Sequence, residues 1–154
     1  MKNKDSLSPP DYRESMETAY CLTRRYGSLT YDEVLANTRQ ALEQNGFEIV
    51  SELAMQDYFK ERLNKEINRY TLLGACHAQL AYDLLQKENK LGVLMPCNVI
   101  VQDLEDRQMV EVSIVDTSTY WQEADSELVK QKAIETKEKL KAIFTQVEQT
   151  NVKL

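Results

Sequence analysis

The tightest constraint on the fold comes from two strand-like segments in the last third of the chain. Residues 92–102 and 109–116 have the composition of strands, and only a short turn around Glu105 and Asp106 joins them. A parallel pair needs a crossover connection of a dozen or more residues. We therefore expect these two strands to be antiparallel neighbours in one sheet.

The rest of the chain adds helices and strands in a fixed order. Apolar residues alternate in residues 19–26, 47–55 and 70–76, which predicts three further strands. A helix is predicted between the first two, because Thr30 and Glu33 form a capping box and Gly46 stands where a left-handed C-terminal residue belongs. Further helices are expected over residues 56–64, 78–86 and 125–147, the last with an apolar stripe of Ala133, Leu140, Ile143, Phe144 and Val147.

These elements predict an α+β fold with a single, mainly antiparallel sheet and helices on one face. One of the helices lies between the third and fourth strands. A length of 154 residues leaves room for one sheet and one helical layer. The other sheet face must then be solvated, dimerised or covered by a ligand, and we expect a homodimer.

The domain boundaries follow from composition. Residues 1–18 carry Pro9, Pro10 and many charges with little to bury, which predicts a flexible tail, and residues 19–150 form a single domain. No apolar run reaches the ~20 residues that span a bilayer, and no apolar core of a secretory signal is found. Three cysteines without framework spacing favour reduced thiols and a cytoplasmic location.

Charge and motif content exclude several functions. The net charge of −6 disfavours a nucleic-acid partner, because phosphate recognition needs a basic face. The chain has no phosphate-binding glycine loop, nucleophile elbow, zinc-ligand spacing or Ser/His/Asp set, and only one histidine and four glycines. We expect no cofactor, and the sequence favours a binding module for a small molecule or a protein over an enzyme.

Two irregular strand positions mark the candidate site. Gly74 weakens a strand unless another group approaches its backbone closely, and Pro96 has no N–H for a ladder, which predicts an edge position or a bulge. Each lies close to a cysteine. Irregular strands are common beside functional sites, so the candidate binding residues are Cys76, His77, Cys97 and Asn98.

The four candidates differ in chemistry. Cys97 shares an apolar register with Val93, Met95, Val99 and Val101, which favours a buried packing role. Cys76 ends a strand at the start of a helix, where the thiolate is favoured. His77 is either a polar residue at the helix start, a thiolate partner or a metal ligand, and Asn98 either binds a ligand or ties down a bulge. The alternative function is therefore thiol-dependent: redox, sulfur-handling or soft-metal chemistry at Cys76 with Cys97 or His77.

Three short segments resemble the family catalogued as domain of unknown function 302. Gly46-Phe47, Leu72-Leu73-Gly74-Ala75-Cys76 and Leu94-Met95-Pro96-Cys97-Asn98-Val99 match its pattern, whereas His77-Ala78 stands where the family usually has Asn-Pro. The resemblance implies a curved antiparallel sheet with helices on one side, similar to the TATA-box-binding-protein-like class, and often a homodimer. It implies no established activity.

Overall fold

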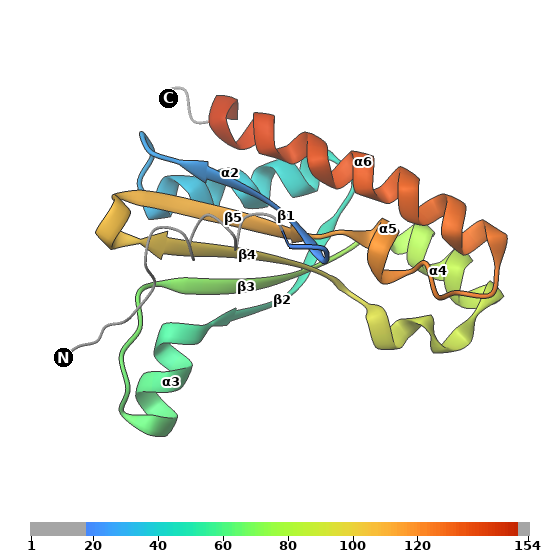
Figure 1. Ribbon diagram of the computed structural model, residues 1–154, viewed down its shortest axis with the longest axis horizontal. Helices are drawn as coiled ribbons and strands as arrows, with labels where there is room; N and C mark the ends of the chain where they lie inside the picture. The colour runs from blue at the N-terminus through green and yellow to red at the C-terminus, as the bar shows by residue number, and fades with distance from the viewer. Residues whose placement is uncertain (1–17, 151–154) are drawn as a thin grey trace.

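The computed structural model describes residues 18–150. The tail expected at residues 1–18 lies outside the described residues, apart from Thr18. Figure 1 shows one sheet of five antiparallel strands in the order β1-β5-β4-β3-β2. The strands are β1 Cys21–Tyr26, β2 Glu48–Ala54, β3 Tyr70–Cys76, β4 Cys97–Leu104 and β5 Met109–Val115. The predicted α+β class and the antiparallel pairing of the last two strands are confirmed.

Helices fill the connections in the predicted order. They are α2 Tyr31–Gln44, α3 Met55–Leu63, α4 Ala78–Lys87, α5 Thr117–Tyr120 and α6 Glu127–Thr150, with 3₁₀ turns η1 Asn89–Leu94 and η2 Glu105–Arg107. Helix α4 is the expected helix between the third and fourth strands. Within residues 18–150, no helix combines the length and apolarity needed to cross a bilayer.

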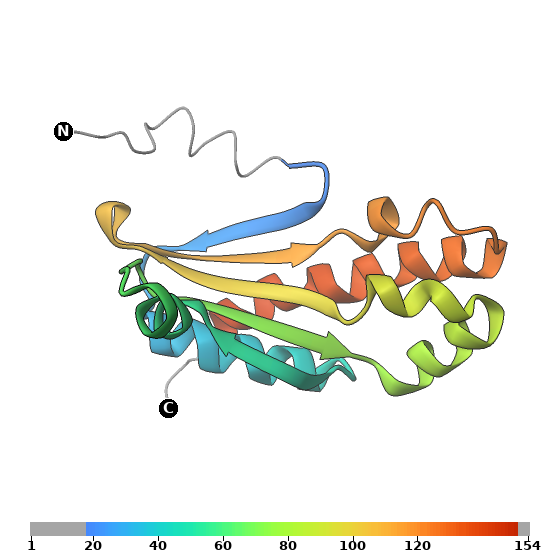
Figure 2. The same ribbon diagram turned by 90° about the horizontal axis from the view of Figure 1, so that it is seen from below.

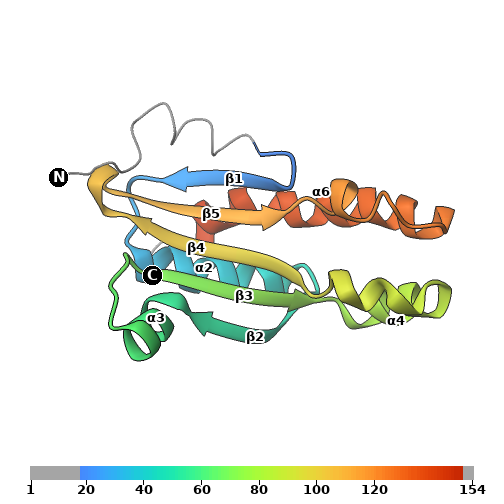
Figure 3. The same ribbon diagram turned by 60° about the horizontal axis from the view of Figure 1, so that its bottom comes forward.

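One face of the sheet is buried beneath α2 and α6, which lie behind the strands in Figure 3 and beside the sheet in Figure 2. The apolar residues of α6 predicted as a stripe are all buried. Alternate residues of the central strands complete this core, namely Leu73, Ala75, Val99, Val101, Val112 and Ile114. Because side chains alternate across a strand, the residues between them point to the opposite face, which α2 and α6 do not cover. We call it the open face.

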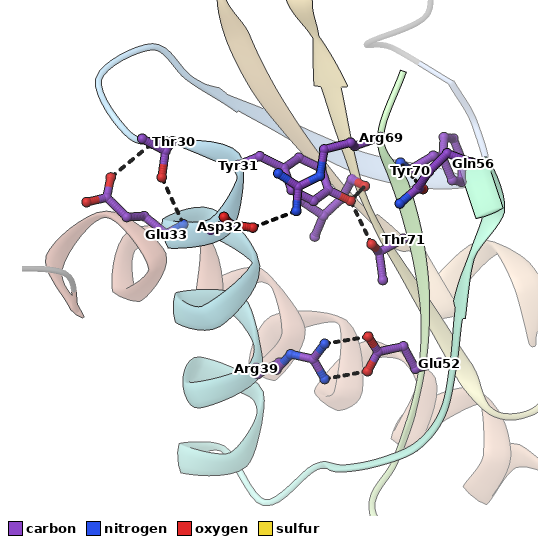
Figure 4. Close-up of polar contacts among 11 residues, drawn as sticks. Thr30, Tyr31, Asp32, Glu33, Arg39, Glu52, Gln56, Arg69, Tyr70 and Thr71 are labelled. Carbon is purple, nitrogen blue, oxygen red and sulfur yellow. Dashed lines mark hydrogen bonds and ion pairs between the residues drawn. The ribbon is translucent and has the colours of Figure 1, made fainter. Parts of the chain in front are cut away.

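Polar contacts fix α2 against the sheet (Figure 4). The predicted capping box forms, with Thr30 and Glu33 each accepting a backbone N–H from the other. Directly after it, the Tyr31 hydroxyl lies 2.6 Å from Thr71 Oγ1 and donates to the Val101 carbonyl at 3.0 Å. About two turns further on, Arg39 pairs with Glu52 of β2 through both guanidinium NH groups.

Hydrogen bonds to α6 carbonyls hold that helix in place from three directions. The Tyr26 hydroxyl of β1 donates to Phe144 O at 2.6 Å, and Asn37 Nδ2 of α2 donates to Val147 O at 2.9 Å. Thr117 Oγ1 at the start of α5 donates to Ala133 O at 2.6 Å. These buried bonds fix the helix along its length, so its position does not depend on apolar contact alone.

Two local predictions were wrong. Residues 92–96 are not strand, because they form the end of η1 and a short extended link, so Val93 is 84% exposed. Strand β4 begins directly after Pro96, which has no N–H for the ladder, and it is a central strand. The expected edge position or bulge at Pro96 is therefore corrected to a strand boundary.

The alternation in residues 47–55 predicts that Phe47, Ile49 and Leu53 face the core, but Leu53 is 39% exposed on the open face. The register of β2 shifts between Ile49 and Ser51, so a β-bulge reverses the alternation after Ile49. Leu53 then pairs with Leu72 on the open face.

The finer assignment to the TATA-box-binding-protein-like class stays a prediction.

Candidate functional site

The three motif segments of the sequence meet at one end of β3. A Cβ atom on Gly74 would lie 2.2 Å from Ser51 Oγ and 2.8 Å from Pro96 Cγ. Both distances are far below a van der Waals contact, so β2 and the link before β4 approach Gly74 more closely than any side chain permits. The predicted close approach at Gly74 is thereby explained.

The helix start after β3 is built from the other motif residues. His77 is the N-cap of α4, with its Nδ1 accepting the Leu80 N–H at 3.4 Å. The His77 ring packs edge-on against Phe47, with centroids 5.6 Å apart. Gly46 has a φ of 87°, and a Cβ there would lie 3.0 Å from His77 Nε2. His77 therefore has a capping and packing role in this arrangement.

Cys76 and Cys97 line one small cavity of about 20 Å³ together with His77, Met95, Pro96 and Trp121. Both thiols are free; Cys76 is half-buried and Cys97 is buried. Burial raises the pKa of the Cys97 thiol to about 12, and the nearby Cys76 adds to the increase. Ligand pockets typically have volumes of ~300–1,000 Å³, so this cavity cannot hold an organic ligand.

The fourth predicted residue lies elsewhere. Asn98 pairs with Gly74 in the sheet register and points to the open face, whereas Cys97 points to the helix-covered face. The structure therefore brings Cys76, His77 and Cys97 together and separates Asn98 from them. Within residues 18–150, no group of three or more His, Cys, Asp or Glu side chains has an arrangement that could hold a metal ion.

Asn98 instead lines a groove of about 470 Å³ on the open face. The strand register places two rows of side chains across this face. One row runs Arg25, Glu111, Gln102 and Tyr70, and the other runs Thr23, Ser113, Ile100, Leu72 and Leu53. The link Met95–Pro96 lines both the groove and the small cavity, so it separates the two spaces.

The groove has an apolar floor and buried polar groups beside it. Leu72 and Ile100 line the floor, and Glu111 and Ser113 are only 6% and 8% exposed although they lie on the open face. The Glu111 carboxylate accepts from Arg25 Nε at 2.8 Å and from Gln102 Nε2 at 3.1 Å. These bonds compensate the removal of the carboxylate from water.

The β1 side of the groove carries a chain of small polar groups. Ser113 Oγ lies 2.8 Å from Thr23 Oγ1, and Cys21 Sγ lies 3.7 Å from Thr23 Oγ1 and 2.9 Å from Thr18 Oγ1. At the rim, Tyr20, Val93 and Tyr120 are exposed at 61%, 84% and 45%. Exposed aromatic and apolar side chains around an apolar floor with a few buried polar groups are typical of a binding groove.

No motif in the sequence marks the groove residues Tyr70, Gln102, Glu111 and Ser113. The signal was present in β5, where Glu111 and Ser113 alternate with the apolar residues Val110, Val112 and Ile114. That alternation defines which face is open, but only the strand order shows that Glu111 stands between Arg25 and Gln102.

The architecture defines a class: small α+β domains with one antiparallel sheet, two helices over one face and a groove on the other. The model of the family described as "Domain of unknown function DUF302" matches residues 22–147, and the chain belongs to this family. The chain is similar to a crystal structure of an uncharacterized conserved DUF302 protein from Bacillus stearothermophilus, with a TM-score of 0.76 and 15% identity. That likeness covers 84% of this chain and 99% of the other, and no curated protein matches the chain.

The close approach at Gly74 yields a stability prediction. Gly74→Ala should lower the free energy of unfolding by about 1–3 kcal/mol, because the added methyl group overlaps Ser51 Oγ and Pro96 Cγ. Chemical denaturation measures this change. Gly27→Ala is the matched control, since nothing lies within 4 Å of a Cβ there, and it should change stability by less than about 0.5 kcal/mol.

Adding Ser51→Ala to Gly74→Ala should restore part of the loss, because it removes the nearer of the two contacts. Equal stability of Gly74→Ala and the unchanged protein would contradict the described packing.

Proposed function

We propose that the chain is a binding module, not an enzyme, and that its small-molecule ligand lies in the open-face groove. The observation that carries this proposal is the groove itself. Its volume of about 470 Å³ lies in the range of small-molecule pockets, and it combines an apolar floor with buried polar groups. Asn98 contributes an amide at the groove wall and is the one candidate from the sequence that a ligand there would contact.

Two further parts of the proposal concern location and assembly. Three free thiols support a reducing compartment such as the cytoplasm.

Exposed apolar side chains gather on β2, α3 and the segment after α3, and we call Val50, Leu53, Tyr58, Leu63 and Ile67 the α3 patch. A second copy covering this patch would remove apolar surface from water. Sedimentation at micromolar chain concentration should then give a dimer, and a monomer at all such concentrations would contradict this part.

Nile red, a neutral dye whose emission rises in apolar surroundings, tests the groove. We expect saturable binding of one dye per chain. Ile100→Lys places a charge on the apolar floor and should weaken binding at least about tenfold, a difference of about 1.4 kcal/mol. Fluorescence titration gives the dissociation constants, and circular dichroism shows that the variant is folded.

Ile134→Lys is the matched control, since Ile134 lies on α6 and is 59% exposed. It should bind the dye as the unchanged protein does. The groove would be excluded as the binding site if Ile100→Lys and Ile134→Lys bound Nile red equally well.

A thiol-dependent function is the second candidate, because Cys76 and Cys97 line the same cavity. In this function the pair would reduce a small-molecule disulfide such as oxidised glutathione. The two thiols give up two protons and two electrons, an Sγ–Sγ bond forms, and the glutathione disulfide is released as two thiols. Cys76 is the attacking group, since it is half-buried while Cys97 is buried with a pKa raised to about 12. The soft-metal form of this function, with Cys76, Cys97 and His77 as ligands, is not supported, because no three such side chains within residues 18–150 are arranged to hold a metal ion.

Mass spectrometry after incubation with oxidised glutathione tests the thiol function in a Cys21→Ser background. The redox function predicts that the native chain loses two hydrogens and gains no glutathione. Adding Cys97→Ala should leave a mixed disulfide on Cys76. Glutathione retained on Cys76 while Cys97 is present would contradict the redox function.

A further inference from the structure

The described lining of the groove carries negative charge but no positive charge. Among the described residues that line it, Glu111 is the only carboxylate, and none is a lysine or an arginine. Glu111 is 6% exposed, so water screens its charge poorly. An anionic ligand would meet this carboxylate without a facing cation and is therefore disfavoured.

Arg25 forms an ion pair with Glu111 and balances its charge, but it is not among the described residues that line the groove, so a ligand in the groove meets the carboxylate of the pair. Arg25 Nε approaches Glu111 Oε2 from β1, and Gln102 Nε2 donates to Oε1 from β4. A carboxylate accepts about four hydrogen bonds in all. A donor entering from the groove can therefore still bond to either oxygen while both of these partners stay in place.

Aromatic side chains add to the attraction for a cation. Tyr70 lies on the floor next to Gln102 in the register, and Tyr20 and Tyr120 stand at the rim. Burial and the neighbouring Glu111 raise the pKa of the Tyr70 hydroxyl, so it stays neutral at physiological pH. The faces of such rings attract ammonium groups.

We propose that the groove selects small organic cations: an apolar body lies over Leu72 and Ile100, and an ammonium group bonds to Glu111 beside Tyr70. The inference rests on the proposed function, because it specifies the ligand class of the same groove. It differs from that function in one respect, which is that charge, and not only apolar surface, decides what binds.

Three naphthalene probes of nearly equal size separate these effects. We would titrate the full chain at neutral pH with 2-naphthalenemethylamine, 2-naphthalenemethanol and 2-naphthoate, which are cationic, neutral and anionic. The amine should bind about tenfold or more tightly than the alcohol, and the naphthoate should bind more weakly than the alcohol. Isothermal titration calorimetry gives the three dissociation constants.

Glu111→Gln is the corresponding variant, since it keeps the shape and a hydrogen-bond acceptor but removes the charge. It should abolish the preference for the amine and leave the alcohol unchanged.

The outcomes distinguish the inference from the proposed function. Equal binding of amine and alcohol, both displacing Nile red, would overturn the cation selectivity and leave the groove as a binding site. Tighter binding of naphthoate would overturn it as well. Failure of all three probes and of Nile red would overturn the proposed function too.

Discussion

Burial of one sheet face beneath α2 and α6 is the constraint on which the rest of the structure depends. Strand side chains alternate, so placing Val99, Val101, Val112 and Ile114 in the core forces their neighbours onto the open face. The Glu111 and Ser113 side chains reach the groove for this reason. The hydrogen bonds from Tyr26, Asn37 and Thr117 to α6 carbonyls hold this helix against the sheet. They thereby keep the same sheet face buried.

The family motif and the groove overlap only in part, because the motif residues Leu72, Pro96 and Asn98 line the groove. Gly46, Phe47, Gly74 and His77 are explained by packing: a left-handed turn, an edge-on ring contact, a close approach of strands and a helix cap. The groove residues Tyr70, Glu111 and Ser113 belong to none of the motif segments. Residues that identify the family therefore build the junction at the end of β3, and the link Met95–Pro96 connects this junction to the groove wall.

Much of the fold could be predicted from local signals. The capping box at Thr30, the left-handed Gly46 and the stripe of α6 are short-range patterns with direct physical causes, and all three are confirmed. The errors at Val93 and Leu53 came from a 3₁₀ turn and a β-bulge, which leave no clear periodicity in one sequence. The burial of Cys97 was predictable from its register, whereas the neighbours of Glu111 were not, because Arg25, Glu111 and Gln102 meet only through the strand order.

The central claim is that a ligand occupies the open face between β1 and η1, and amide chemical-shift mapping tests it most directly. A ¹H–¹⁵N titration with the cationic naphthyl probe should shift the amides of Tyr70, Ile100 and Ser113 most, because they line the groove or lie beside it. The amide of Ile134 on α6 should not move. Shifts confined to the α3 patch or to α6 would contradict the claim.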